Sequence, residues 1–183
     1  KSDEITKEMA TVSVNNKSVA PGFGGFYWQY FEDLDQIKSS QESTMIIEKE
    51  LYLKATTSEG MQLHRITQEK PLKIGDLVTI RLVISTKEDM EFVHLKDMRA
   101  SCFEPIDVLS KYKWQDGLGY YQSTKDVATH FFFDQIKKGK FVLEYDIRVN
   151  NLGDFSNGIT TIQSMYAPEF SSHTKGIRVK IKE

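Results

Sequence analysis

Alternation of apolar and polar residues with a period of two is the main pattern along this chain. It is clearest in FVLEYDIRV, residues 141–149, where five apolar side chains occupy alternate positions. The same period runs from Val78 to Ile84 and from Ile177 to Ile181. Successive side chains of a β-strand point to opposite faces, so each of these segments is predicted to be a strand with one buried and one solvent-exposed face.

Short breaks separate the predicted strands. Residues 58–60 are expected to turn a hairpin, Pro105 to stop a strand, and residues 137–139 to turn the chain again. No apolar set recurs at helical spacing over three turns, so we expect at most one or two short helices, near residues 30–38 or 106–112. Strands at intervals of roughly 8–15 residues predict an all-β fold, an antiparallel β-sandwich of the immunoglobulin-like type.

The polar, serine-rich stretch at residues 33–44 divides the chain. We take residues 1–44 as a leading segment and residues 45–183 as the sandwich domain. Within the leading segment, ATVSVNNKSVAP predicts two short strands joined at Asn15-Asn16, and FYWQYF predicts an aromatic strand.

Composition and charge narrow the choice of partners. The 183 residues carry a net charge of −2 and no basic stripe that would neutralise phosphates, so nucleic acid and anionic membrane surfaces are not expected partners. No run approaches the roughly 18 apolar residues of a membrane span, so direct membrane insertion is not expected. The chain opens on Lys-Ser-Asp-Glu rather than Met, and we expect it to be a piece of a longer or processed protein.

Residue types that carry catalysis are present, but their spacing does not favour an active site. His94 and Asp97 are three positions apart and would point to opposite faces of a strand. The sequence contains no Gly-x-Ser-x-Gly motif. Cys102 lies at the end of an apolar strand, just before Glu104, which favours a buried thiol over a reactive one. We therefore predict that the chain is not an enzyme and has no catalytic or cofactor-binding residue.

The acidic run of Glu32, Asp33 and Asp35 is the candidate for binding a cation. It lacks the glycine and the spaced oxygen ligands of a calcium loop, so we predict a solvated loop and no metal site. The single cysteine can form neither an internal disulfide nor a zinc site with other cysteines.

Aromatic residues suggest a binding surface. Trp114, Tyr120 and Tyr121 flank a glycine-containing loop, and Trp28 lies in the aromatic segment of the leading region. Exposed planar rings would bind a glycan or a protein, whereas the same residue types also build cores. Exposure of the two tryptophans separates these interpretations.

A second aromatic feature is the corner formed by Met165, Tyr166 and Pro168. Proline cannot donate a hydrogen bond to a sheet ladder, so we expect a strand to end here. We expect Met165 and Tyr166 to pack as structural anchors beneath the crossing that leads to the last strand.

Several segments, taken in order, resemble one protein family. They are FYWQYFEDLDQI, FVHLKDMRASCFEP, WQDGLGYYQSTKD, FFFDQIKKGKFVLEYDIRV and GITTIQSMYAPEFSSHTKGIRVKI. Together they resemble the C-terminal region of bacterial alpha-2-macroglobulin-like proteins, in particular the long versions of Bacteroidetes-type bacteria. The resemblance covers residues 45–183 and implies a macroglobulin-like β-sandwich, with residues 1–44 as the link from a preceding CUB-like region.

The resemblance also implies a function. It indicates a non-catalytic structural and interaction domain at the C-terminus of a protease-trapping protein, an endopeptidase inhibitor of the cell envelope, periplasmic or extracellular, with a lipid anchor on the parent as one option. The implied partners are neighbouring domains of the parent chain and, through the parent, target proteases. The family's thioester motif is Cys-Gly-Glu-Gln, whereas Cys102 precedes Phe-Glu-Pro, so the motif is not in this chain. The alternative function is a surface module that binds glycan or protein through its aromatic residues.

Overall fold

The structure, a computed structural model, describes part of each of two units, Lys1–Phe31 and Glu32–Glu183. The described residues are 6–25, 31–40, 42–58, 60–67 and 70–183. Most of the expected aromatic strand FYWQYF, including Trp28, lies outside them.

The leading unit has one 3₁₀ turn, η2 (Lys7–Ala10), and no strand among its described residues. The two short strands expected in ATVSVNNKSVAP are therefore wrong. Asn16 instead makes a local turn, because its Oδ1 accepts from Ser18 N at 2.9 Å and its Nδ2 donates to Ala20 O at 2.9 Å. An isolated two-stranded hairpin buries too little apolar surface to be stable alone.

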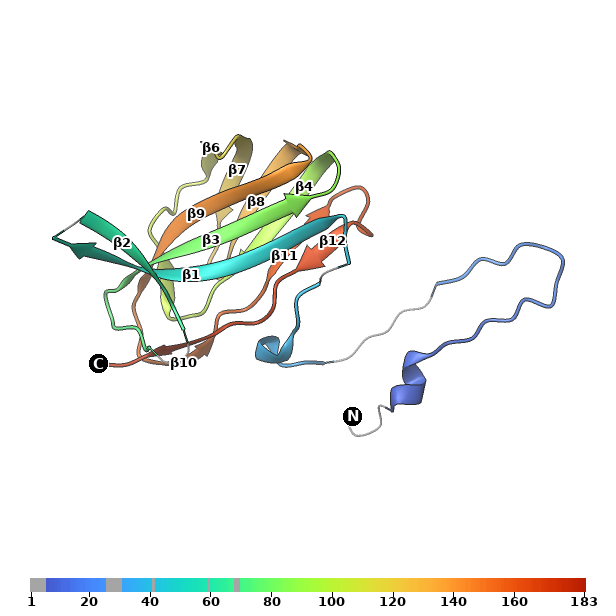
Figure 1. Ribbon diagram of the computed structural model, residues 1–183, viewed down its shortest axis with the longest axis horizontal. Helices are drawn as coiled ribbons and strands as arrows, with labels where there is room; N and C mark the ends of the chain where they lie inside the picture. The colour runs from blue at the N-terminus through green and yellow to red at the C-terminus, as the bar shows by residue number, and fades with distance from the viewer. Residues whose placement is uncertain (1–5, 26–30, 41, 59, 68–69) are drawn as a thin grey trace. The chain divides into compact units, whose positions relative to one another are not determined.

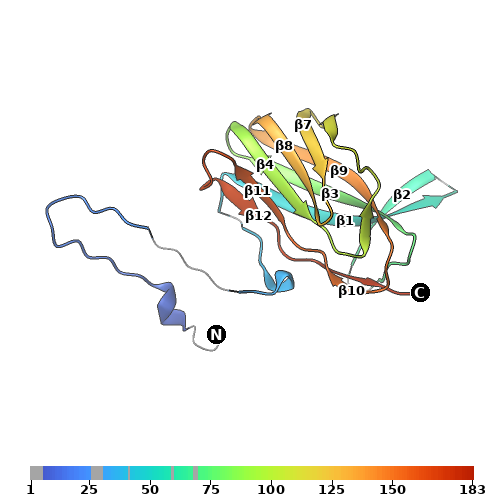
Figure 2. The ribbon, with the colours of Figure 1, turned by 180° about the vertical axis from the view of Figure 1, so that it is seen from behind.

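The second unit is built from two antiparallel sheets that face each other (Figure 1). The five-stranded sheet has the order β2-β1-β3-β9-β5, with β2 (Gly60–Arg65), β1 (Met45–Thr57), β3 (Leu77–Thr86), β9 (Gly139–Val149) and β5 (Phe103–Pro105). The six-stranded sheet, in front in Figure 2, has the order β12-β11-β4-β8-β7-β6, with β12 (Ser171–His173), β11 (Thr160–Ser164), β4 (Met90–Met98), β8 (Ala128–Ile136), β7 (Leu118–Thr124) and β6 (Lys111–Gln115). The predicted antiparallel β-sandwich is confirmed.

The predicted alternations supply the core between the sheets. The apolar residues at alternate positions from Val78 to Ile84 on β3 are all 0% exposed. On β9, Leu143, Ile147 and Val149 are at most 1% exposed. This strand pairs with β3 along the full length of β3. The short helix expected near residues 30–38 is a single 3₁₀ turn, η3 (Leu34–Gln36).

The end of the chain forms a small additional sheet. β13 (Arg178–Ile181) pairs with β10 (Gly153–Ser156) and buries Val179 and Ile181. Leu72 is held against it, since Leu72 N donates to Lys180 O and Lys182 N donates to Leu72 O, both at 2.8 Å. The last predicted strand is confirmed, and its alternation buries one face.

A buried ion pair joins the two large sheets. Lys49 on β1 places its Nζ 2.5 Å from Oδ1 of Asp97 on β4, and both side chains are 0% exposed. Lys49 also donates to the carbonyl of Met98 at 2.7 Å. Burial lowers the pKa of Lys49, and the attraction of Asp97 opposes that shift.

Two hydroxyl groups complete the surroundings of the Asp97 carboxylate. Thr160 Oγ1 on β11 donates to Oδ1 at 2.6 Å, and the Tyr145 hydroxyl on β9 donates to Oδ2 at 2.5 Å. Burial and the nearby charge of Asp97 raise the pKa of Tyr145 well above its ordinary value, so this hydroxyl keeps its proton. The carboxylate thus accepts hydrogen bonds from strands of both sheets.

Two histidines form a hydrogen-bonded pair on the outer face of the six-stranded sheet. His94 Nε2 on β4 lies 2.9 Å from His130 Nδ1 on β8, and the rings are within 2° of parallel with centroids 5.1 Å apart. With the nitrogens this close, that centroid separation places the rings edge to edge, so one ring donates a proton to the other. Burial lowers the pKa of both rings, and the charge of Lys96 adds to the effect.

Removing one partner of the buried ion pair should destabilise the domain strongly. We expect Lys49→Met and Asp97→Leu each to lower the free energy of unfolding by about 3–5 kcal/mol, because the other charge stays buried alone. The double variant should lose clearly less than the sum of the two single changes. Urea denaturation measures all three, and strictly additive losses would contradict the pairing.

The histidine pair should make the stability of the domain depend on pH. Both pKa values are depressed in the folded state, so the unfolded chain takes up protons first and the free energy of unfolding falls as pH drops below about 6.5. The slope is at most about 1.4 kcal/mol per pH unit for each proton. Replacing both rings, as His94→Asn/His130→Asn, should flatten this dependence, whereas His64→Asn, at an exposed position on β2, should not. Equal slopes in all variants would refute the assignment.

Candidate interaction surface

The β6–β7 hairpin positions Trp114, the single tryptophan in the sequence of residues 32–183. Its two-residue loop is Asp116-Gly117, with φ of 50° and 78°. Positive φ at both loop residues is the geometry of the tight hairpin turn that Asp-Gly favours. The turn pairs Trp114 on β6 directly with Gly119 on β7.

The Trp114 ring is held in place although it is 76% exposed. A Cβ atom placed on Gly119 would lie 2.8 Å from Cε3 and Cζ3 of the indole, so the ring lies directly against the glycine backbone. Gly119 lacks the side chain that would push the ring away. One part of the indole is therefore covered by the neighbouring strand while most of it faces outward.

The tip of this hairpin also reaches the other sheet. Asp116 Oδ2 accepts from Val142 N at 2.7 Å, and Gln115 Oε1 accepts from Glu144 N at 3.1 Å. Both donors are on the edge of β9 that faces away from β3. Unpaired edge groups of a sheet invite pairing with other chains, so these side chains cap part of an open edge.

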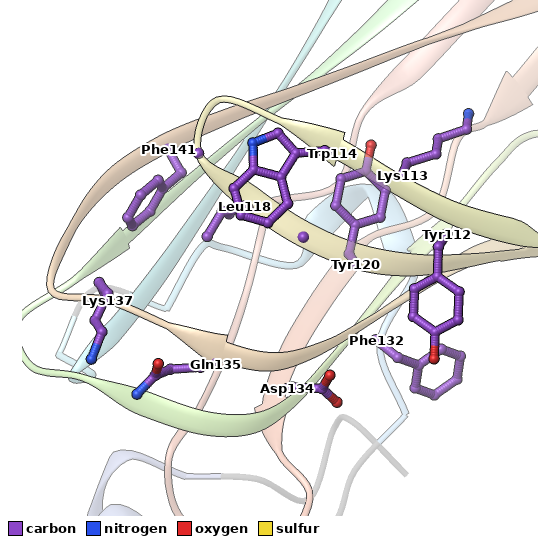
Figure 3. Close-up of a pocket in the computed structure, with 12 residues that line it drawn as sticks. Tyr112, Lys113, Trp114, Leu118, Tyr120, Phe132, Asp134, Gln135, Lys137 and Phe141 are labelled. Carbon is purple, nitrogen blue, oxygen red and sulfur yellow. The ribbon is translucent and has the colours of Figure 1, made fainter.

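A groove of about 730 Å³ lies beside the hairpin (Figure 3). It opens where the ladder between β7 and β8 stops, after the pair Tyr121 and Phe132. Beyond that pair β7 follows its hairpin partner toward β9 and leaves β8. The groove is lined by Tyr112, Trp114, Phe132, Asp134, Gln135 and Phe141, among others.

The two lysines at the groove are ion-paired, whereas Asp134 forms no ion pair with the described residues. Lys113 is ion-paired with Asp107 at 2.7 Å, and Lys137 with Asp89 at 2.9 Å. The hydrogen bonds from these lysines lower the pKa of each partner carboxyl group. Asp134 is exposed, and its carboxylate makes no hydrogen bond or ion pair with any residue that the structure describes.

Of the three aromatic residues predicted to form an interaction surface, the structure leaves two accessible. Trp114 is exposed, and Tyr121 is half-buried, with its ring 5.0 Å from that of Tyr112 at 64°. Tyr120 is among the residues that line the groove, but at 4% exposure it offers a partner little accessible area. Adjacent residues of a strand face opposite ways, and Tyr120 shares the inward face of β7 with Leu118.

The aromatic-proline corner ends a strand as expected, but its anchors are not packed. β11 ends at Ser164, and Phe170 N closes the turn on Ala167 O at 2.9 Å. Tyr166 is 80% exposed, and its ring is nearly perpendicular to that of Phe92 with centroids 5.2 Å apart, while Met165 and Pro168 are also exposed. The expected packing of Met165 and Tyr166 is therefore wrong; Phe170 packs against the core instead.

Several other residues considered for chemistry are either buried in the core or bonded to another side chain. Cys102 is buried, and desolvation raises the pKa of its thiol to about 11. Asp97 points into the core while His94 points outward, so the predicted opposite orientation is confirmed. Asp35 forms an ion pair with Arg178, with 2.6 Å between Oδ2 of Asp35 and Nη1 of Arg178.

The described residues contain no group of three or more histidine, cysteine, aspartate or glutamate residues placed to hold a metal ion. No helix within this part of the chain is long and apolar enough to cross a membrane.

The features that sequence reasoning missed are Lys49, Tyr145 and Thr160 around Asp97, and Phe92 at the corner. The sequence did contain a signal for Lys49, because it occupies the alternate position between Ile47 and Leu51, which both face the core. Phe92 carries a φ of 49°, which no sequence pattern indicated.

Solved structures with the same fold come from bacterial alpha-2-macroglobulins. The Y1175G mutant of Salmonella alpha-2-macroglobulin matches with a TM-score of 0.62 and 13% identity, over 80% of this chain and 10% of that one. Trypsin-activated Escherichia coli alpha-2-macroglobulin matches with a TM-score of 0.62 and 12% identity, over 80% of this chain and 11% of that one. The chain therefore spans a small part of these proteins.

Two sequence comparisons also gave matches. The Circularly permutated Ras protein 2 of Dictyostelium discoideum is 24% identical over 130 residues, which are 71% of this chain and 3% of that protein. The family model of the bacterial alpha-2-macroglobulin MG10 domain matches residues 45–169, more than half of the chain. The chain belongs to the bacterial alpha-2-macroglobulin MG10 domain family.

Proposed function

We propose that this chain is the non-catalytic C-terminal structural and interaction domain of a Bacteroidetes-type alpha-2-macroglobulin-like protein that traps proteases. The match of residues 45–169 to the MG10 family carries the proposal. Similar structures include Escherichia coli alpha-2-macroglobulin activated by trypsin and by porcine elastase, which supports a protease-linked parent. We place the parent in the cell envelope.

The interior of the domain suits a mechanical role. The Lys49–Asp97 pair, with both side chains 0% exposed, and its hydroxyl partners tie both sheets together. A sandwich tied in this way moves as one body, as a domain must when the cleavage of a distant segment rearranges a large chain. Lys49, Asp97 and Thr160 are buried and so are not placed to act on a substrate, which supports the proposal that the domain is not an enzyme.

Exposed apolar side chains offer docking surfaces for neighbouring domains of the parent. Phe92, Met165 and Tyr166 gather at one corner and are 46%, 54% and 80% exposed. Interfaces between domains of one chain are built from such patches, rimmed by polar residues. We propose that a neighbouring domain covers this corner in the parent.

We propose that residues 1–44 link this domain to a preceding CUB-like region. Val12, Val14, Val19 and Phe23 are 53% to 111% exposed, although their sequence is that of strands. Strand-forming residues without a partner strand are expected to pair with a sheet outside this chain. Residues upstream in the parent would supply that sheet.

A protease treatment of the parent protein tests the proposed function. Trypsin or elastase should cleave the parent, reduce its hydrodynamic radius and remain associated with it on size-exclusion chromatography. The same protease with its active site blocked by a covalent inhibitor should leave the radius unchanged. The isolated chain should hydrolyse peptide, ester and glycoside substrates no faster than a blank. A parent that is cleaved without changing size or retaining protease would show that the proposal is wrong.

A further inference from the structure

We propose that the groove beside the β6–β7 hairpin binds an uncharged saccharide. This site does not depend on the proposed protease trap and does not include Met165 or Tyr166. Its parts are a fixed aromatic platform, polar side chains that make no hydrogen bond with the described residues, and a concave space between them (Figure 3).

Trp114 provides the platform. The indole is supported from behind by the backbone at Gly119 and is 76% exposed, so an apolar ring face stays open to solvent at a fixed orientation. Aromatic faces carry partial negative charge and attract the weakly positive C–H groups that a pyranose ring presents on one face. Tyr112, 78% exposed on the same face of β6, extends this platform by a second ring.

Asp134 and Gln135 on β8 provide the polar contacts. Both side chains are exposed at the groove, and no hydrogen bond links either of them to another side chain of the described residues. A carboxylate accepts hydrogen bonds, while an amide both donates and accepts. Neighbouring hydroxyl groups of a sugar match this combination. Figure 3 shows these two side chains across the opening from Trp114.

The charges argue for a neutral ligand. The two lysines at the groove, Lys113 and Lys137, are already paired with Asp107 and Asp89. The one free charge at the groove among the described residues is therefore the Asp134 carboxylate, which repels a phosphate or a carboxylate ligand. A hydroxyl-rich neutral ligand avoids that repulsion and still uses the acceptor oxygens.

The dimensions fit a short oligosaccharide. A space of about 730 Å³ lies within the roughly 300–1,000 Å³ typical of small-ligand sites. It exists because the β7–β8 ladder stops at Tyr121 and Phe132. Two positions further along, the same register would pair Gly119 with Asp134, and both residues line the groove instead.

Titration of the isotope-labelled full chain with neutral trisaccharides tests the site. The probes are maltotriose, cellotriose and tri-N-acetylchitotriose, followed by nuclear magnetic resonance. We expect at least one to shift the indole N–H signal of Trp114 saturably, with a dissociation constant of about 1 mM or lower. The Trp28 indole signal is the internal reference and should stay in place.

Variants assign the effect to the groove. Trp114→Ala and Asp134→Asn should each weaken binding at least about tenfold, read from the backbone amide signals of Gly117 and Gly119. Tyr166→Ala removes an exposed aromatic ring at the other site and should bind as the wild type does. Far-ultraviolet circular dichroism checks that each variant is folded.

Two outcomes would overturn the proposal. In the first, no trisaccharide shifts the Trp114 signal; if a proline-rich peptide then shifts it, the groove is a peptide site. In the second, the Trp114→Ala variant binds with unchanged affinity. Neither outcome bears on protease trapping, which is measured on the parent protein.

Discussion

The ion pair between Lys49 and Asp97 is the interaction that fixes how the two sheets meet. Burying two charges carries a desolvation cost that is offset only when geometry and hydrogen bonding are good, and here Thr160 and Tyr145 complete the carboxylate's bonds. A shift of β1 by two residues would keep its apolar face toward the core but carry Lys49 away from Asp97, which would then be buried without its countercharge. The pair therefore selects one register among those that the apolar residues would tolerate.

The strand pattern could be predicted from the sequence because it depends on short-range alternation. The alternate residues of β3 and β9 face the core as predicted, and β1 pairs antiparallel with β2 as the predicted hairpin requires. The ion pair could not be predicted, since its partners lie 48 residues apart and each looks like a surface charge on its own. The one sequence signal was the position of Lys49, which alternates with apolar residues that face the core.

The aromatic residues show where sequence reasoning stops. Trp114, Tyr120 and Tyr121 are similar in type, yet strand alternation places Tyr120 inside and its neighbours outside. Met165 and Tyr166 follow an apolar run, which suggested burial, but the strand ends at Ser164 and they lie beyond the sheet. Whether a large apolar residue faces the core depends on where a ladder ends, and long-range pairing decides that.

The groove and the capped edge of β9 have one physical origin. A strand that stayed paired with β8 beyond Tyr121 would fill the groove and leave the amides of Val142 and Glu144 open to other chains. By leaving β8, the hairpin brings Gln115 and Asp116 to those amides, and their side-chain oxygens replace a strand as acceptors. The resulting space beside Trp114 follows from that exchange, so protection of the edge and a binding groove are compatible within a single hairpin.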